Sequence, residues 1–343
     1  MAAIAEPRAR SSTRALDVTL RLLEAGPVVI LVLLCAVIAI LQPVFLTTLN
    51  LQNVVLQSSV VAVLAIGLLV VIVTGGIDLS IGSTMALATV IGWEVYQQVG
   101  DDGGVLVVVS MVILGLVVGL GNGLLYVVGR VPHPLIVTLA TLSIVQSIGL
   151  VITHSQPLPG MPPLVDYLGR GFVGPVPVAA IAVAVVAFLA TVFLKRTQWG
   201  RWIFAVGGDT EAARRMSIPV PVVLISAYAV CGSFAGFAGV LVAGNIGGGS
   251  ATIGQAAGGL LDAVAAVIIG GASILGGRGT VWNCIIGALL IGVIRNGLAL
   301  GGASPFLQGL LVGSTILVAV ELDVIRTVIE RRIRTIQSNL ASM

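Results

Sequence analysis

Long and nearly uncharged apolar runs dominate this sequence, and they leave few folds open to it. From Val54 to Trp93, Asp78 is the only formally charged residue. A helical run of about 20 apolar residues matches the thickness of the hydrocarbon core of a bilayer. The runs of this kind are about ten in number: 27–46, 53–75, 79–98, 104–129, 134–153, 173–194, 222–244, 255–275, 279–299 and 305–322. The sequence therefore predicts an all-α polytopic membrane protein with about ten transmembrane helices.

Composition argues against a large soluble α/β core. Hydrophobic residues make up 57% of the 343 residues and charged residues only 9%, whereas a soluble domain carries about 25% charged residues. The runs also lack the polar–apolar alternation of barrel strands. Helices are favoured because they satisfy their own backbone hydrogen bonds inside a bilayer.

The positive charges give the expected orientation, because cytoplasmic segments of membrane proteins are rich in Lys and Arg. With a cytoplasmic N-terminus, 15 of the 17 Lys and Arg fall on the inner side, leaving Arg170 outside and Arg295 within a run. We therefore expect both termini in the cytoplasm. The expected divisions are an arm at 1–25, a transmembrane domain at 26–323 with a cytoplasmic loop at 195–221, and a tail at 324–343. The net charge of +3 then reflects topology and not binding of nucleic acid.

The segment VTGGIDLSIGS, Val73 to Ser83, carries the lone carboxylate of its run. Gly75 and Gly76 are a natural end for the preceding helix. Asp78 or Ser80 can cap the next helix, whose positive end favours a carboxylate. The segment is predicted to be a tight inner turn, or a mobile gate at the inner mouth of a pathway. The two interpretations are compatible.

The loop at 195–221 contains GGDTEAARRMSIP, which predicts a short helix outside the membrane. Asp209 is a natural N-cap, and Glu211 favours the positive end of the helix dipole. Arg214 and Arg215 favour the negative end, and Pro219 is expected to stop the helix. Either the helix is simply solvated or it docks a soluble subunit.

Asp262 and Arg295 are opposite charges inside neighbouring apolar runs. Their depths below the outer surface differ by about 5 Å at a rise of about 1.5 Å per residue. An unpaired charge there is costly, so an intramembrane ion pair is predicted. A structural clasp is favoured over a substrate site.

Other polar residues in the runs are candidates for lining a pathway, although each is also suited to helix–helix hydrogen bonding. They are Gln57, Ser58, Ser59, Asn122, Ser143, Gln146, Ser147, Asn283 and Asn296. The stretch GGIDLSIGSTMALATVIG from Gly75 also resembles GGRGTVWNCIIGALLIG from Gly276. This similarity indicates either a structural repeat, as in many transporters, or two similar turns in a Gly-rich chain.

Several kinds of chemistry find no support in the sequence. No metal or disulfide site is expected, because the cysteines lie within apolar runs and the histidines are isolated: Cys35, Cys231, Cys284, His133 and His154. Lys195 is the only lysine, and it lacks the glycine-rich approach of a phosphate-binding loop. We therefore expect no enzyme and no bound cofactor in this chain.

Four stretches together resemble the membrane permeases of bacterial ATP-binding-cassette importers for monosaccharides, the ribose, xylose, arabinose and autoinducer-2 group. They are VTGGIDLSIGS with NVVLQSSVVAVLAIG before it, GNGLLYVVGRVPHPLIVTLATLSIV, GRWIFAVGGDTEAARRMSI, and LDAVAAVIIGGASILGGRGTVWNCIIGALLIGVIRNGL. The resemblance covers about residues 50–323. The chain departs from the family's pattern at 132–135, at Leu261, where an acidic residue is common, and at Arg295, often an Asn.

The resemblance implies a permease domain at 26–323 whose loop at 195–221 couples it to an ATPase. ATP and Mg would be bound by that separate ATPase subunit. The coupling residues would be Asp209, Glu211, Ala212, Ala213, Arg214 and Arg215. It further implies a second permease chain, identical or related, an extracytoplasmic sugar-binding protein, and alternating access in the bacterial inner membrane.

Other functions remain open at this point. A related permease for a nucleoside or an amino acid would have similar spans. An ion-coupled secondary transporter would need intramembrane carboxylates, for which Asp262 and Glu94 are the candidates. An intramembrane enzyme would need a catalytic pair that the sequence does not offer.

Overall fold

The computed structural model describes residues 26–256, 259–304, 307–315, 317–318 and 320–321. The expected arm at 1–25 and tail at 324–343 lie outside the described residues. The long helices are Gly26–Leu41, α2 (Thr48–Val73), α3 (Ile81–Val99), α4 (Gly104–Val127), α5 (Pro134–Thr153), α7 (Val178–Arg196), α10 (Val220–Ile246) and α13 (Val281–Leu300). The described residues between 307 and 321 are also helical.

Short elements join these helices. They are η1 (Pro43–Leu46), η2 (Asp101–Gly103), α6 (Pro163–Arg170), α8 (Gln198–Gly208), α9 (Thr210–Arg215), α11 (Ile253–Ala256) and α12 (Leu260–Ile269). The strands are β1 (Leu158–Pro159), β2 (Phe172–Val173), β3 (Val176–Pro177) and β4 (Gly248–Gly249). Strand β1 pairs with β4 and β2 pairs with β3, both antiparallel. Neither two-stranded ribbon follows from the apolar pattern.

Six helices in the described part of the chain are long and apolar enough to cross a membrane. They are α2, α4 with η2, α5, α7, α10 and α13. The protein is therefore an all-α polytopic membrane protein. Helix α3 and the helix Gly26–Leu41 are not among the six, so the count of ten stays a prediction.

The expected span at 255–275 is wrong as a continuous helix. Instead α11 is followed by α12, which has only 10 residues and so spans about 15 Å, half of the hydrocarbon core. At Gly259 the chain approaches itself so closely that a Cβ would lie 1.7 Å from the Gly254 carbonyl oxygen. Helix α12 then ends in a turn in which Gly271 has a φ of +79°.

Helix α2 lies at the centre of the molecule, and its residues from Ser58 to Val73 are all buried. A helix that is apolar on every side is stable only when it is surrounded. Here α7, α10, α12 and α13 surround it. The interior cluster accordingly contains most of α2 together with residues of these helices.

Helices α4 and α10 pack closely because both carry glycines at their interface. A Cβ on Gly115 would lie 2.0 Å from the Gly232 carbonyl oxygen, and one on Gly119 would lie 2.1 Å from the Tyr228 carbonyl oxygen. Backbone contact of this kind fixes α10 against α4. Tyr228 of α10 is therefore held in place beside the turn between α2 and α3.

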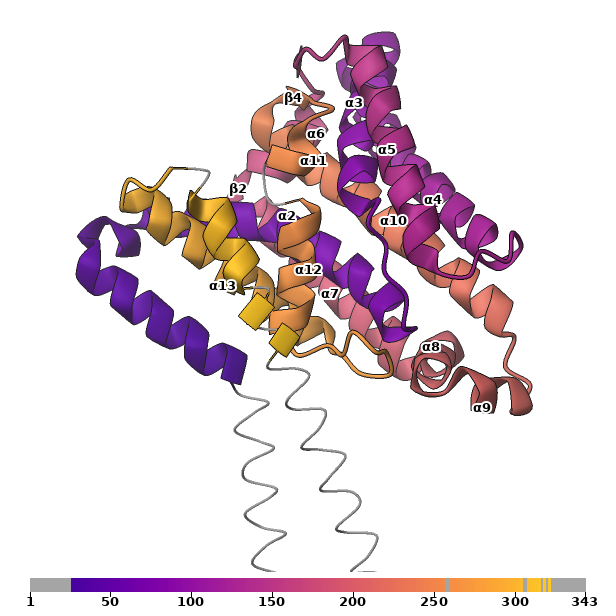
Figure 1. Ribbon diagram of the computed structural model, residues 1–343. Coiled ribbons are helices and arrows are strands. Elements are labelled where there is room, and N and C mark those ends of the chain that lie inside the picture. The colour runs from indigo at the N-terminus through magenta and orange to yellow at the C-terminus, as the bar shows by residue number, and fades with distance from the viewer. Residues whose placement is uncertain (1–25, 257–258, 305–306, 316, 319, 322–343) are drawn as a thin grey trace, which may run out of the picture.

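The connecting elements gather at different places on the molecule (Figure 1). Helices α8 and α9 lie together at the lower right of the view, while α6, α11 and β4 lie at the top. The loops 154–172 and 195–221 are thus both structured by short elements.

Candidate functional site

The turn between α2 and α3 buries the carboxylate of Asp78, which is 1% exposed. Asp78 Oδ1 accepts hydrogen bonds from the Ser80 backbone N–H at 2.9 Å and from the Ser80 hydroxyl at 2.7 Å. The carboxylate therefore fixes the turn just before α3. These hydrogen bonds offset the free-energy cost of burying the carboxylate.

A chain of polar contacts extends this turn to α4 and α5. Asn122 Nδ2 donates to the Ser80 hydroxyl oxygen at 2.8 Å and reaches Asp78 Oδ1 at 3.5 Å. The Thr141 hydroxyl donates to Asn122 Oδ1 at 2.6 Å. Asn122, a candidate for lining a pathway, is 1% exposed and links α4 and α5 to the turn.

The glycines of the turn are required by their surroundings. Gly75 has a φ of +82°, which L side chains rarely adopt, and a Cβ on Gly76 would lie 2.6 Å from the Tyr228 hydroxyl oxygen. That hydroxyl donates to the Ile77 carbonyl at 3.4 Å. The turn is thus wedged against the fully buried Tyr228.

Three glycine-containing segments meet next to it, at a place we call the glycine junction: Gly75, Gly207, Gly276 and Gly277. The Gly277 N–H donates to the Val73 carbonyl at 2.9 Å. A Cβ on Gly207 would lie 1.7 Å from the same oxygen, and one on Gly276 would lie 2.9 Å from the Gly75 nitrogen. The end of α2, the end of α8 and the loop before α13 are therefore in backbone contact.

The glycine junction also joins the two stretches whose sequences resemble each other. The stretch from Gly75 leads into α3 and the stretch from Gly276 leads into α13. The structure thus brings the two similar turns into direct contact.

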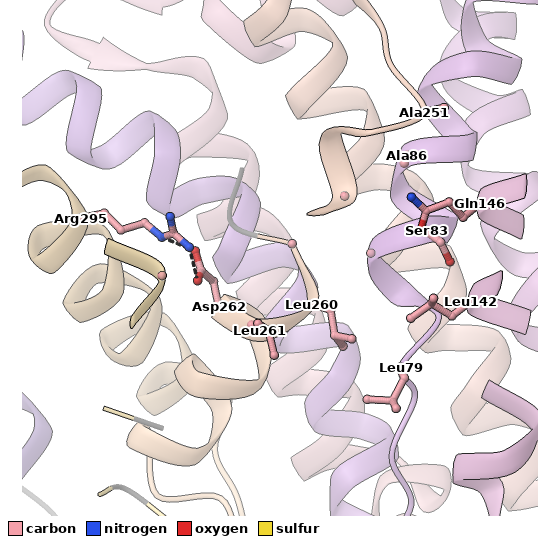
Figure 2. A pocket seen from close by; sticks show the side chains of 14 residues that line it. Leu79, Ser83, Ala86, Leu142, Gln146, Ala251, Leu260, Leu261, Asp262 and Arg295 are labelled. Carbon is pink, nitrogen blue, oxygen red and sulfur yellow. Dashed lines mark hydrogen bonds and ion pairs between the residues drawn. The ribbon is translucent and has the colours of Figure 1, made fainter. Parts of the chain in front are cut away.

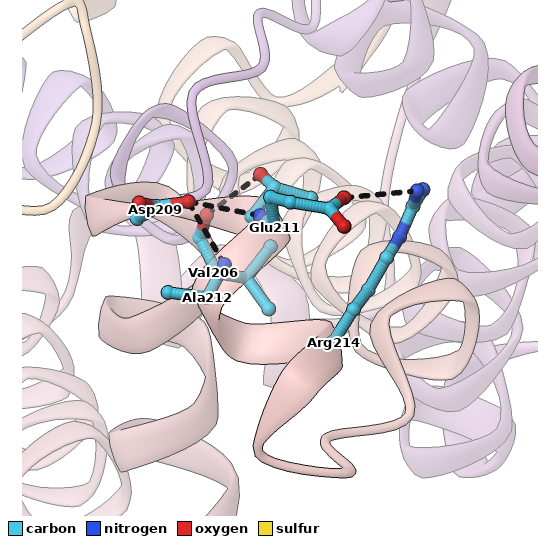
Figure 3. A network of polar contacts seen from close by, with 6 residues as sticks. Val206, Asp209, Glu211, Ala212 and Arg214 are labelled. Atoms are coloured by element: carbon cyan, nitrogen blue, oxygen red, sulfur yellow. Dashed lines mark hydrogen bonds and ion pairs between the residues drawn. The ribbon is translucent and has the colours of Figure 1, made fainter.

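Helix α9 begins at Thr210, shortly after this junction. Asp209 is its N-cap and accepts from the backbone N–H groups of Glu211 and Ala212, both at 2.9 Å (Figure 3). The N-cap predicted from the sequence is confirmed. Pro219 does not stop the helix, which ends at Arg215; Ser217 turns with a φ of 59° and Pro219 caps α10 instead.

The surface of α9 is almost wholly exposed. Ala213 is buried and anchors the helix, while Asp209, Glu211, Ala212, Arg214 and Arg215 are exposed. Glu211 and Arg214 lie 3.7 Å apart and are each more than 60% exposed, so their ion pair adds little stability. These side chains are therefore available to another molecule.

The structure places Asp262 and Arg295 together. Arg295 Nη2 donates to Asp262 Oδ1 at 2.7 Å, and Nε lies 2.7 Å from Oδ2. Both residues line a cavity of about 320 Å³ that Gln146 and Ser83 also line. Of the nine polar residues proposed to line a pathway, Gln146 is the one that borders this cavity.

The remaining polar candidates lie elsewhere. Asn296 and Asn50 exchange hydrogen bonds of 2.8 and 2.9 Å. Asn283 donates its backbone N–H to the Thr280 N-cap of α13. Gln57 is exposed on α2, Ser58 and Ser59 border a second apolar cavity, and Ser143 and Ser147 border a shallow groove on α5.

Sequence reasoning missed Tyr228, Thr141 and Gly207 as parts of the site. Each contacts a residue far away in the sequence, as Tyr228 contacts Ile77. The glycine pair GG at 207–208, directly before Asp209, was the one available signal.

Comparison with known proteins finds a family that matches most of this chain. Residues 50–320 match the family described as branched-chain amino acid transport system / permease component. The comparison with solved structures found no match.

Curated relatives are similar over most of their length. The ribose import permease protein RbsC of Bacillus subtilis (strain 168) is 36% identical over 88% of this chain and 92% of its own. The RbsC protein of Escherichia coli (strain K12) is 35% identical over 88% of this chain and 94% of its own. The galactose/methyl galactoside import permease protein MglC of Escherichia coli (strain K12) is 35% identical, with the same coverage. The chain therefore belongs to this family of transport-system permease components.

Proposed function

We propose that this chain is the permease subunit of an ATP-driven importer that carries a monosaccharide across the bacterial inner membrane by alternating access. The observation that carries the proposal is the similarity, over 88% of the chain, to permeases named for the import of ribose or galactose. The buried turn at Asp78 and the exposed helix α9 supply parts that such a subunit needs.

The face carrying α8 and α9 is assigned to the cytoplasm. Its exposed basic residues are Lys195, Arg196, Arg201, Arg214 and Arg215. Lys and Arg concentrate on the cytoplasmic side of membrane proteins. With ten spans, both termini then lie in the cytoplasm as well, and the domains are those at 1–25, 26–323 and 324–343.

Helix α9 is assigned as the docking element for a separate ATPase subunit, which binds ATP and Mg. Asp209 rigidifies its start, and Glu211, Ala212, Arg214 and Arg215 are exposed beside it. No cofactor is assigned to the permease chain itself.

The glycine junction gives α9 a path to the membrane helices. Displacement of α9 displaces Gly207, whose backbone contacts Val73 and Gly277. The turns touched there lead into α3 and α13, which contribute Ser83 and Arg295 to the cavity. Closely packed elements transmit strain because they compress little, which suits switching between inward- and outward-facing states.

The other partners are a second permease chain, identical or related, the surrounding lipid, and an extracytoplasmic sugar-binding protein. The binding protein sets the affinity for sugar. A cavity lined by only a few polar side chains is then sufficient for passage.

Transport in proteoliposomes tests the proposal. The chain is purified from its native membranes with the ATPase and binding protein that accompany it, and uptake of labelled ribose and galactose is followed with and without ATP. ATP-dependent sugar uptake is expected. Uptake of leucine instead of sugar would favour the alternative of a non-sugar permease. Leucine is the probe because the family's description names branched-chain amino acid transport.

An ion-coupled secondary transporter is the less favoured alternative. Asp262 is neutralised by Arg295 at 2.7 Å and so does not offer a lone coupling carboxylate. Uptake that persists without ATP and collapses with the ion gradient would support that alternative.

A further inference from the structure

The cavity beside the Asp262–Arg295 pair has two polar walls that face each other (Figure 2). The ion pair, from α12 and α13, stands on one side, and Gln146 of α5 and Ser83 of α3 stand on the other. Leu260 and Leu79 lie between the two walls, and Leu142 lies below Ser83 on the side of Gln146. The volume of about 320 Å³ is at the lower end of the range for small-molecule pockets, about 300–1,000 Å³.

The ion pair is arranged to contact a guest as well as to join two helices. The side chain of Asp262 is 1% exposed, whereas that of Arg295 is 26% exposed. The guanidinium carries five N–H donors in a fixed plane, and its Nε and Nη2 face the carboxylate. Arg295 also lines the cavity, which places its guanidinium within reach of a molecule there.

The charges of the two walls determine the kind of guest. Arg295 is neutralised by Asp262, so the pair offers hydrogen-bond donors and acceptors without net charge. The Ser83 hydroxyl donates to the Ser80 carbonyl at 2.9 Å, which leaves its oxygen as an acceptor. A neutral molecule with several hydroxyl groups, each both donor and acceptor, is complementary to such walls, and the leucines suit the C–H faces of a sugar ring.

A purely structural clasp does not explain this arrangement. A buried ion pair is costly to desolvate, and well-packed apolar residues join helices equally well. Ionisable residues inside a membrane that border a cavity mark substrate pathways.

We propose that this cavity is a transient sugar site within the pathway, in which hydroxyls bridge Arg295 and Asp262 on one wall to Gln146 and Ser83 on the other. The inference rests on the proposed function and adds the site and its specificity residues. Arg295 is the specificity-determining residue, because it supplies the directional donors.

The test uses the assembled transporter in proteoliposomes with saturating binding protein, and labelled ribose, galactose and 2-deoxyribose as probes. Gln146→Leu and Arg295→Met are each expected to lower sugar uptake about tenfold, the loss of one hydrogen bond to a charged or fixed polar group. Gln97→Leu, at an exposed glutamine near the end of α3 and outside the cavity, is the matched control and should transport like the unaltered protein.

Selectivity separates a substrate contact from a clasp. If Arg295 contacts a hydroxyl, Arg295→Met should lower the ratio of ribose uptake to 2-deoxyribose uptake. A defect in the clasp alone would lower the uptake of both sugars equally. The Asp262→Arg/Arg295→Asp double variant keeps an ion pair and should therefore assemble like the unaltered protein in size-exclusion chromatography. It should not recover the unaltered ratio of ribose uptake to 2-deoxyribose uptake.

The two proposals fail in different ways. If the unaltered transporter moves no sugar with ATP, the proposed function fails. If it does, and assembled Gln146→Leu and Arg295→Met keep its uptake and its selectivity, the sugar site alone is overturned.

Discussion

The backbone of Gly207 rests on the carbonyl of Val73, so closely that a Cβ at position 207 would lie 1.7 Å from that oxygen. This contact joins the element that leads to α9 with the end of the central helix α2. At its neighbour Gly208 the Cβ position is open, with nothing within 4 Å of an added Cβ. Two adjacent glycines of one helix therefore differ in the room that they leave for a side chain.

Gly207→Ala is expected to lower the amount of sugar taken up per ATP hydrolysed. Relief of the overlap requires a backbone shift that costs about 1–3 kcal/mol or more, and that shift occurs where α9 meets α2. Uptake per ATP hydrolysed in proteoliposomes measures the effect. Gly208→Ala is the control and should behave as the unaltered protein; an equal loss in both variants would contradict a specific role for the junction.

Asp78→Asn is expected to reduce transport while the protein still inserts into the membrane. The amide keeps the shape but weakens the hydrogen bonds from Ser80, each worth about 1.5–3 kcal/mol when the acceptor is charged. Thermal unfolding of the purified protein and sugar uptake are measured together. Asp102→Asn, at an exposed residue of η2, provides the comparison, and full uptake by Asp78→Asn would remove the role of the turn.

The local parts of this fold follow from sequence, and the contacts between distant parts do not. Asp209 caps α9 as its position predicts, because capping depends on residues only two or three positions away. Asn122 lies 44 positions from Asp78, and no local pattern identifies it as a partner of that carboxylate. The break within the run 255–275 was not predicted, because apolar content carries no information about how closely Gly259 approaches Gly254.

The predicted ion pair between Asp262 and Arg295 is present, with 2.7 Å between Oδ2 and Nε. The depth estimate behind the prediction assumed a continuous helix at 255–275, whereas the structure has α11 and α12 there. Which side of the pair faces a cavity depends on α3 and α5, whose packing the sequence does not reveal.

Asn296→Leu is expected to destabilise the protein without changing its choice of sugar. Asn296 and Asn50 exchange two hydrogen bonds in a buried place, and removing one partner leaves the other unsatisfied at a cost of about 1–3 kcal/mol. The Asn50→Leu/Asn296→Leu double variant should recover part of the loss, as a double-mutant cycle of thermal unfolding would show. Altered sugar selectivity with unchanged stability would instead place Asn296 in the pathway.

Glu211→Ala and Arg214→Ala are each expected to abolish co-purification of the ATPase. The free energy of unfolding should stay within about 0.5 kcal/mol of that of the unaltered protein. The ion pair between them is exposed, with its atoms 3.7 Å apart, and so contributes little to folding. Pull-down from native membranes with a tagged chain gives the measurement. Asp102→Ala is the matched control, and retention of the ATPase by both α9 variants would remove the docking assignment.

Labelling from each side of the membrane tests the orientation on which the docking assignment depends. Ala212 of α9 and Gln156, in the loop before β1, are both exposed, and they are assigned to opposite faces. In a Cys35→Ser background, which leaves the buried Cys231 and Cys284, Ala212→Cys should react with a membrane-impermeant maleimide only in inside-out vesicles. Gln156→Cys should react only in right-side-out vesicles. Reaction of Ala212→Cys from the outside would place α9 away from any cytoplasmic ATPase, and the basic residues around it would then contradict the usual charge asymmetry of membrane proteins.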